Sequence, residues 1–488
     1  MSPLTAITGL YGQGLLYGGP AVLIWGWVLT GCFTMLVGLA MGELSSKFPV
    51  SGGLYFWSFM LAGQYGPCAS WLVGWVNMLG QIAFVSSNTY TFVQFFAAGL
   101  FLYSGSPAVI GYYPSNGMQL YVYGGLLIVY ASINGFPLKT VTKLARIGTW
   151  WLVAGSFIIV LTLLMVTKKH QKWSWVLADF ESNAGAGITN NIYIFVLGLL
   201  TACWSFTGYD ASAHLIEETM AADATAGWPI LYAIGASFVI GLVYLLSLTV
   251  CIQDLTDLTN PTISLSGSYV AQIMWDVFES RYGYGLPSLL LMLVPLGAIC
   301  FCGILSITSA SRMLYGFSRD GAVPFSETWM QVDKATGVPL HAVWAVTSAS
   351  FIMGLPLLQG PAAFLATTSI ATVGLALCYG LPIGLHVLAS NRFEAGAFTL
   401  GRWSVPVGYV SFTWLMFCVV IFMLPTAYPI TGVTFNFAPA VLGGILLLAG
   451  VVWCLTARFW FAGPRTDVHN SDVVKVQYWI SDPPRRCN

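Results

Sequence analysis

Long apolar runs dominate this chain, and only short polar segments separate them. A membrane-spanning helix needs roughly 20 mostly apolar residues. Eleven stretches satisfy this requirement: about 19–42, 70–101, 119–137, 149–168, 191–214, 228–251, 287–311, 339–358, 362–388, 406–425 and 437–461. A shorter apolar piece, about 3–16, precedes them. The pattern predicts an all-α, polytopic membrane protein with eleven full spans, numbered here segments 2 to 12, and a partial first helix, segment 1.

The composition supports a lipid environment. Only 7% of the 488 residues are charged and 57% are hydrophobic, whereas a soluble domain carries about 25% charged residues. The expected partner is therefore the lipid bilayer. The net charge of zero gives no basic field that would attract nucleic acid. The ten Cys show no metal-ligand spacing, so we expect no metal site and no cofactor.

Lysine and arginine indicate the orientation, because they are enriched in cytoplasmic loops. If the loop between segments 2 and 3 is cytoplasmic, only Lys168, Lys169, Lys172 and Arg281 fall outside. The other fourteen of the 18 fall inside: Lys47, Lys139, Lys143, Arg146, Arg312, Arg319, Lys334, Arg392, Arg402, Arg458, Arg465, Lys475, Arg485 and Arg486. The bias predicts one transmembrane domain, 1–462, and a cytoplasmic C-terminal tail, 463–488.

Two stretches suggest interrupted helices, which a membrane tolerates only where backbone lines a cavity or is buried in protein. The first is Thr5–Gly9 and the second is Trp204–His214, inside segment 6. Segments 1 and 6 open two five-span halves, and breaks at equivalent places are typical of inverted-repeat transporters. Asp210, at membrane depth in the second break, predicts a functional residue. The alternative is a hydrated Asp210 at the cytoplasmic end, or one that caps a half-helix.

Four stretches carry a resemblance to a known family. They are GWVLTG at 26–31, GELSSKFPVSGGLYFWS at 42–58, FTGYDASAHLIEET at 206–219 and ASRMLYGFSRDGAVP at 310–324. Together they resemble the amino acid–polyamine–organocation superfamily, in its amino acid/choline branch, which includes plant-type bidirectional amino acid transporters and fungal GABA permeases. The resemblance implies a secondary transporter (permease) of amino acids or GABA-like solutes that works by alternating access, and not an enzyme.

The resemblance also implies a leucine-transporter-type fold, with two inverted five-helix repeats plus two helices, and a set of site residues. The substrate carboxylate would meet backbone at Thr5, Ala6 and Ile7. Its amine would meet carbonyls around the second break, at Trp204, Ser205, Phe206, Thr207 and Gly208. Trp204 matches an aromatic gate, and Gln81 a position that faces substrate. Coupling or gating roles fall to Asp210, Ser306, Ser309, Glu43 and Lys47, the last two as a cytoplasmic pair.

Plainer interpretations stay open for several of these residues. Trp204 could serve packing, and Gln81 could join helices by a hydrogen bond. Ser306 and Ser309 could bond to the backbone of their own helix. Glu43 and Lys47 could be a solvated pair.

The coupling ion also stays open between a proton and sodium. Some proton-coupled relatives use a Lys on segment 5, and Ile147–Val166 contains none.

Four further alternatives concern the protein as a whole. One is a choline or polyamine permease of the same fold. An intramembrane enzyme would need convergent nucleophile, base or metal ligands, and a channel would favour a repeated polar ring. Relatives also carry a tail and a half-helix before the first break, where this chain has only Met1 and Ser2. That departure suggests either an incomplete, N-terminally truncated sequence or a transport-impaired short form.

Overall fold

The computed structural model describes residues 2–464, except 51, 106–110, 181–186, 215–226, 256–257, 259–266, 357–360, 390–392, 395 and 432–433. Most of the predicted tail, 463–488, therefore lies outside the described residues. The described part contains helices and no strand.

The helices, in chain order, are α1 (Pro3–Leu16), α2 (Gly19–Lys47), α3 (Leu54–Leu61), η1 (Gly63–Tyr65), α4 (Gly66–Ser104), α5 (Asn116–Asn134), α6 (Leu138–Val166), α7 (Trp173–Ala178), α8 (Asn191–Ser205), α9 (Ala211–His214), α11 (Gly227–Val250), α13 (Tyr269–Tyr282), α14 (Ser288–Arg319), α15 (Ser326–Trp329), α16 (Leu340–Gly354), α17 (Pro361–Leu388), η6 (Gly401–Trp403), α18 (Ser404–Phe422), α19 (Ala438–Leu455) and η7 (Ala457–Phe459).

A helix occupies each of the eleven predicted full spans. Within the described residues, eight helical stretches are long and apolar enough to cross a membrane, and α8 and α16 are shorter apolar helices. The prediction of an all-α polytopic membrane protein is confirmed. The relation between the two five-helix halves stays a prediction.

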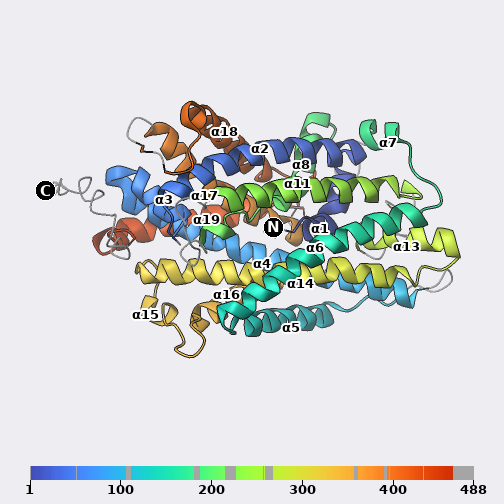
Figure 1. The fold of residues 1–488 in the computed structure, drawn as a ribbon, viewed down its shortest axis with the longest axis horizontal. Coiled ribbons are helices and arrows are strands. Elements are labelled where there is room, and N and C mark those ends of the chain that lie inside the picture. Colours follow the sequence, from blue (N-terminus) through green and yellow to red (C-terminus); the bar gives the residue numbers. More distant parts are fainter. Residues whose placement is uncertain are drawn as a thin grey trace.

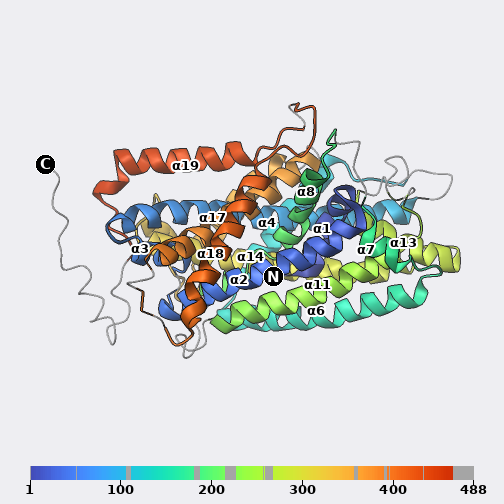
Figure 2. The ribbon, with the colours of Figure 1, turned by 90° about the horizontal axis from the view of Figure 1, so that it is seen from above.

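The long helices run side by side along the longest axis of the molecule (Figure 1). In the view from above, α19 and α6 lie at opposite edges, with α4, α14 and α17 between them (Figure 2). The burial of the helices agrees with these positions. In the most apolar stretch of each helix, 78% of the residues of α17 and 67% of those of α4 are buried, against 22% for α6 and 17% for α19. The inner helices therefore form the protein core, and the outer ones face lipid.

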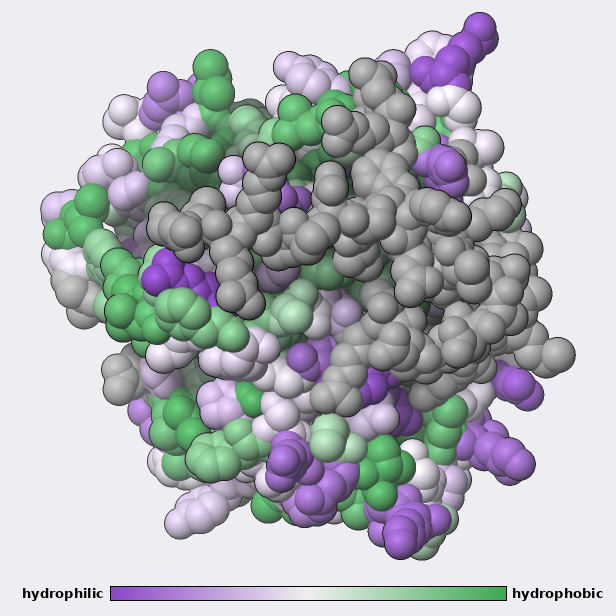
Figure 3. Space-filling model, turned by 90° about the vertical axis from the view of Figure 1, so that its left-hand side faces the viewer, coloured by the Kyte–Doolittle hydropathy of each residue, from purple (hydrophilic) through white to green (hydrophobic). Residues whose placement is uncertain are grey.

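The end of the molecule that α3 reaches has a mixed surface. Seen from that end, hydrophilic residues gather toward the lower edge and hydrophobic residues lie between them (Figure 3).

Glycine permits close helix contacts where aromatic side chains cross a neighbouring backbone. A Cβ added to Gly241 on α11 would lie 2.0 Å from the Trp27 ring of α2. The Trp27 indole N–H donates to the Phe238 carbonyl oxygen at 3.0 Å. Since membrane helices associate through packing and interhelical hydrogen bonds, this contact fixes α2 against α11.

Buried amides and hydroxyls join the helices around α14. The Asn134 side-chain amide of α5 donates to the Ile304 carbonyl oxygen of α14 at 2.9 Å and accepts from the Thr308 hydroxyl at 2.6 Å. The Tyr123 hydroxyl of α5 donates to the Ser350 carbonyl oxygen of α16 at 2.7 Å. These bonds connect α5 to two neighbours through groups that are almost fully buried.

One sequence expectation is wrong: Thr5–Gly9 is not an interruption. α1 is continuous from Pro3, and the Ser2 hydroxyl caps it by accepting from the Thr5 N–H. Proline suits the first helical position because its missing N–H would have no partner there. The glycine in this stretch serves packing instead, since a Cβ on Gly9 would lie 2.9 Å from Thr91 of α4.

The Asn134 bonds lead to a stability prediction. Asn134→Ala should lower the free energy of unfolding by about 1–2 kcal/mol, because it removes the two buried hydrogen bonds that join α5 to Ile304 and Thr308 of α14. Ser132→Ala is the control, since the Ser132 hydroxyl is exposed and bonds only within α5. Thermal midpoints from fluorescence-detected gel filtration would test this. Equal midpoints for the two variants would contradict it.

Candidate functional site

The second predicted break is confirmed. α8 ends at Ser205 and α9 begins at Ala211. Between them Gly208 has φ +93°, a conformation that glycine adopts without the steric cost of a Cβ. Within the described part of the chain, the carbonyls of Ser205, Phe206 and Thr207 accept no hydrogen bond. The break therefore leaves acceptor groups available at the C-terminal end of α8.

Asp210 lies in this break and has 0% exposure. Its carboxylate accepts from the Gln81 amide of α4 at 3.1 Å and from the Tyr379 hydroxyl of α17 at 2.8 Å. The His214 Nε2 atom of α9 lies 3.4 Å from the same carboxylate. A buried charge is tolerated only with such compensation. The complete burial contradicts the alternative of a hydrated Asp210. Among the described residues, the carboxylate accepts hydrogen bonds from the Gln81 and Tyr379 side chains and from no N–H group of α9.

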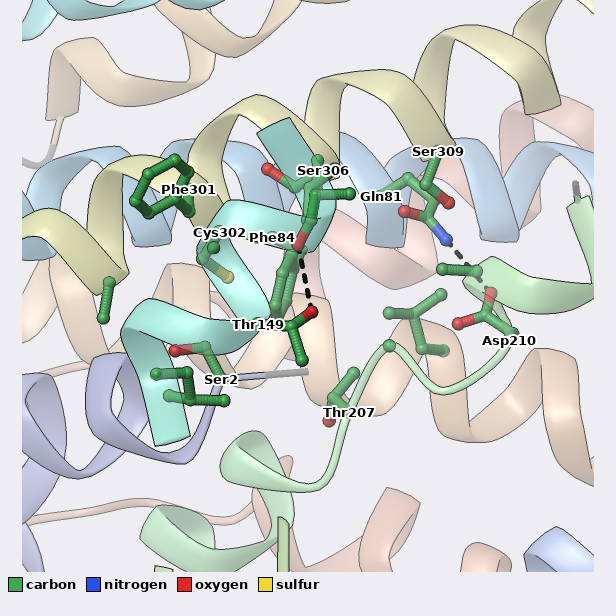
Figure 4. A pocket seen from close by; sticks show the side chains of 18 residues that line it. Ser2, Gln81, Phe84, Thr149, Thr207, Asp210, Phe301, Cys302, Ser306 and Ser309 are labelled. Carbon is green, nitrogen blue, oxygen red and sulfur yellow. Dashed lines mark hydrogen bonds between the residues drawn. The ribbon is translucent and has the colours of Figure 1, made fainter. Parts of the chain in front are cut away.

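A cavity of about 120 Å³ adjoins this carboxylate (Figure 4). A cavity of about 150 Å³ can hold a benzene-sized molecule, so the space suits a small solute. The wall consists of Ser2, Gln81, Phe84, Ala145, Gly148, Thr149, Leu152, Thr207, Gly208, Asp210, Ala211, Ala298, Phe301, Cys302, Leu305, Ser306, Ser309 and Leu375. Six of these were predicted as site residues: Gln81, Thr207, Gly208, Asp210, Ser306 and Ser309.

The N-terminal end of α1 reaches the same cavity through Ser2 (Figure 4). Thr5, Ala6 and Ile7, predicted to bind a carboxylate, are not on its wall. The Thr5 N–H faces the Ser2 hydroxyl, and the Ala6 N–H donates to the Ser2 carbonyl oxygen. The positive end of the α1 dipole thus faces the cavity, with Ser2 in front of the predicted backbone groups.

Trp204, Ser205 and Phe206, predicted as site residues at the end of α8, each contact a different part of the protein. Trp204 is buried, and its ring packs 6.1 Å from that of Phe84 and 6.4 Å from that of Phe364. Ser205 bonds to the Thr201 carbonyl oxygen, and the Phe206 ring packs against Trp27. None of these three residues is on the cavity wall, but Phe84, which packs against the Trp204 ring, is.

The two serines of α14 also differ. The Ser306 hydroxyl donates to the Gly303 carbonyl oxygen of its own helix at 2.9 Å. The buried Ser309 hydroxyl has no hydrogen-bond partner among the described residues. Only Ser309 is thus left with an unused polar group beside the cavity.

A second cavity, of about 260 Å³, lies between the C-terminal part of α1, the N-terminal part of α17 and the segment joining α18 to α19. Gln13, Ser369 and Asn436 contribute polar groups to it. Phe364, which packs on Trp204, lies on the same turns of α17. An aromatic contact therefore lies between the break and the helix segment that lines this cavity.

Sequence reasoning missed several residues of the site, including Ser2, Thr149 and Cys302 of the cavity wall and Tyr379 as a partner of Asp210. The spacing of Asp210 and His214 is a signal that could have been used, because residues four apart lie on one helix face. Tyr379 gave no such signal, since its contact with Asp210 spans 169 residues of sequence.

Glu43 and Lys47 do not form the predicted pair. The buried Glu43 carboxylate accepts from the Thr399 hydroxyl at 3.0 Å, the Leu400 N–H at 3.1 Å and the Ser404 hydroxyl at 2.6 Å. Lys47 instead lies 3.4 Å from the exposed Glu394. Three hydrogen bonds satisfy a buried carboxylate better than one flexible lysine, so Glu43 fixes the segment before α18 against α2.

Comparisons with known proteins find similarity to amino acid permeases over almost the whole chain. The family model described as amino acid permease matches residues 2–447. An amino-acid permease BAT1 homolog of Oryza sativa subsp. japonica is 41% identical over 96% of this chain and 90% of its own length. Amino-acid permease BAT1 of Arabidopsis thaliana is 39% identical over 96% and 91%. A GABA-specific permease of Saccharomyces cerevisiae is 31% identical over 98% and 82%.

The Glu43 contacts lead to a second stability prediction. Glu43→Gln should cost about 1–3 kcal/mol of unfolding free energy, because the amide keeps one acceptor oxygen where three donors converge. Lys47→Gln should cost less than about 1 kcal/mol, because its ion pair is at the surface. Thermal midpoints in one detergent compare the two variants, and an equal loss in both would show that Glu43 has no special role.

Proposed function

This chain belongs to the amino acid permease family and is a secondary transporter of amino acids, and we propose that it works by alternating access around the cavity beside Asp210. One observation carries the proposal: a fully buried carboxylate lies where α8 is interrupted, on the wall of a solute-sized cavity. Membership of a permease family sets aside the intramembrane-enzyme alternative.

The cavity offers complementary ends for a zwitterionic substrate. The N-terminal end of α1 favours an anion, because the helix dipole gives this end a partial positive charge. At the C-terminal end of α8, Thr207 lies on the cavity wall, and its carbonyl, which accepts no hydrogen bond among the described residues, favours an ammonium group. We therefore assign the substrate carboxylate to the α1 end at Ser2 and the amine to the α8 end.

The rest of the wall favours a small neutral side chain. Phe84, Leu152, Phe301 and Leu305 are apolar, and the cavity wall holds one carboxylate, Asp210, and no lysine or arginine. A polyamine needs several anionic partners along its length, so this wall supports a neutral amino acid or a GABA-like solute over a polyamine. The name of the yeast GABA-specific permease agrees with this substrate class.

We assign the coupling role to Asp210, with a proton as the coupling ion. Its carboxylate accepts from Gln81 and Tyr379 and lies at ion-pair distance from His214. Protonation would remove the charge that holds α4, α9 and α17 together at the break. Trp204 and Phe364 would seal the cavity on its outer side, since the Trp204 ring at the break packs against the Phe364 ring of α17.

The distribution of lysine and arginine supports a cytoplasmic C-terminus. Fourteen of the 18 cationic residues fall on one side when the loop between α2 and α4 is placed inside, as the positive-inside rule requires. We extend this orientation to the whole transmembrane domain, 1–462, and to the tail after it.

Asp210→Asn tests the coupling role. It should lower the initial rate of labelled alanine or GABA uptake into proteoliposomes about 10- to 100-fold, because hydrogen bonds to a charged group contribute about 1.5–3 kcal/mol. The residual uptake should no longer respond to an imposed pH gradient. Tyr379→Phe should give a smaller loss and keep the response.

Asp333→Asn is the matched control, because Asp333 bonds Thr336 in the segment between α15 and α16, away from the cavity. Unchanged uptake by Asp210→Asn at every pH would remove Asp210 from the mechanism. Wild-type uptake that follows a sodium gradient and ignores pH would overturn proton coupling.

A tag after Asn488 tests the orientation. With a cytoplasmic C-terminus, an antibody should label the tag only after cells are permeabilised. Labelling of intact cells would contradict the orientation, with a tag in the 169–190 segment as the opposite control.

A further inference from the structure

One exposed face of α6 changes from cationic to apolar along its length. Lys139, Lys143 and Arg146 are all exposed. At 100° per residue they fall within an arc of about 60°. Trp150 follows four residues after Arg146 on the same face, and Phe157 continues it; their side chains are 68% and 65% exposed. We call this set the α6 stripe.

The cations of the stripe lack acidic partners in the described part of the chain. None of the three forms an ion pair there. The first turn of α6 also contains no acidic residue. A helix N-terminus carries partial positive charge, so lysines in the first two turns add to it where an anion would be favourable. The N-terminal end of α6 therefore has a positive field that the described protein does not neutralise.

The apolar half of the stripe narrows the choice of anion. α6 is one of the least buried of the long apolar helices, with only 22% of the residues in its most apolar stretch buried. Tryptophan is enriched at the membrane–water interface, and Trp150 stands between the cations and the apolar part. A free phosphate or an acidic peptide would use only the cations, whereas a phospholipid uses both halves.

We propose that the α6 stripe binds an anionic phospholipid. Lys139, Lys143 and Arg146 contact the headgroup phosphate, Trp150 lies at the glycerol level, and an acyl chain runs along Phe157. Clustered basic residues beside a membrane helix are typical of anionic lipid recognition.

The opposite side of α6 connects this site to transport. Ala145, Gly148 and Thr149 line the central cavity. A Cβ on Gly148 would lie 2.9 Å from the Phe301 ring of α14, so α6 and α14 are in close contact there. A lipid that holds the stripe therefore biases the position of one cavity wall. This effect on uptake rests on the proposed function, whereas lipid binding does not.

The binding test uses the purified full chain and native mass spectrometry, with phosphatidylglycerol and phosphatidylcholine as probes. The wild type should retain phosphatidylglycerol preferentially. The triple variant Lys139→Gln, Lys143→Gln, Arg146→Gln should lose at least about fivefold of that preference, since each basic residue near a membrane surface contributes about 1 kcal/mol.

Lys168→Gln, Lys169→Gln, Lys172→Gln is the matched control, because it removes three exposed lysines beyond the other end of α6 and should change nothing. Lys139→Arg, Lys143→Arg should retain the preference. Equal retention by wild type and the triple variant would overturn the proposal. Displacement of the lipid by millimolar inorganic phosphate would also overturn it, in favour of a free-anion site.

A separate experiment tests whether the bound lipid affects uptake. Wild type should transport faster in vesicles containing phosphatidylglycerol than in pure phosphatidylcholine, and the triple variant should show no difference. Lipid binding without any lipid effect on uptake would keep the site and overturn the coupling. A failure of the proposed function would appear as no saturable uptake in any lipid, with binding intact.

Discussion

The carboxylate of Asp210, buried at the interruption between α8 and α9, is the constraint on which the centre of the molecule depends. A charge without solvent must receive hydrogen bonds from its surroundings. Gln81 and Tyr379 supply them, and these donors lie on α4 and α17, the two most buried of the long apolar helices. The core is thus arranged around an ionisable group as well as around apolar packing.

Some polar side chains of the interior have hydrogen-bond partners, and others have none among the described residues. Asn134 and Thr308 bond to each other and to the helix backbone, and they join α5 to α14. The Ser309 hydroxyl and the Trp204 indole N–H, at or near the cavity, have no partner among the described residues. Satisfied groups make a rigid scaffold, whereas unsatisfied ones are available to a solute or to water.

The sequence predicted the spans well because hydrophobic length is a local property, and lipid admits little else. The break in segment 6 was also predictable, from Gly208 beside an acid in an apolar run. The break at Thr5–Gly9 was wrong, because glycine there serves packing against Thr91. Partners far apart in sequence, such as Tyr379 for Asp210, depend on tertiary contacts that no local pattern contains.

Glu43 shows why a residue type at a given spacing does not determine its partner. Its spacing from Lys47 suits an ion pair on one helix face, yet its carboxylate bonds to the irregular segment before α18. Asp210 shows the reverse arrangement, since it lies in the irregular segment itself and its carboxylate bonds to Gln81 and Tyr379 on neighbouring helices. In a chain with 7% charged residues, these two buried acids both fix irregular backbone beside packed helices. The exposed cations of α6 face outward instead, where lipid headgroups can neutralise them.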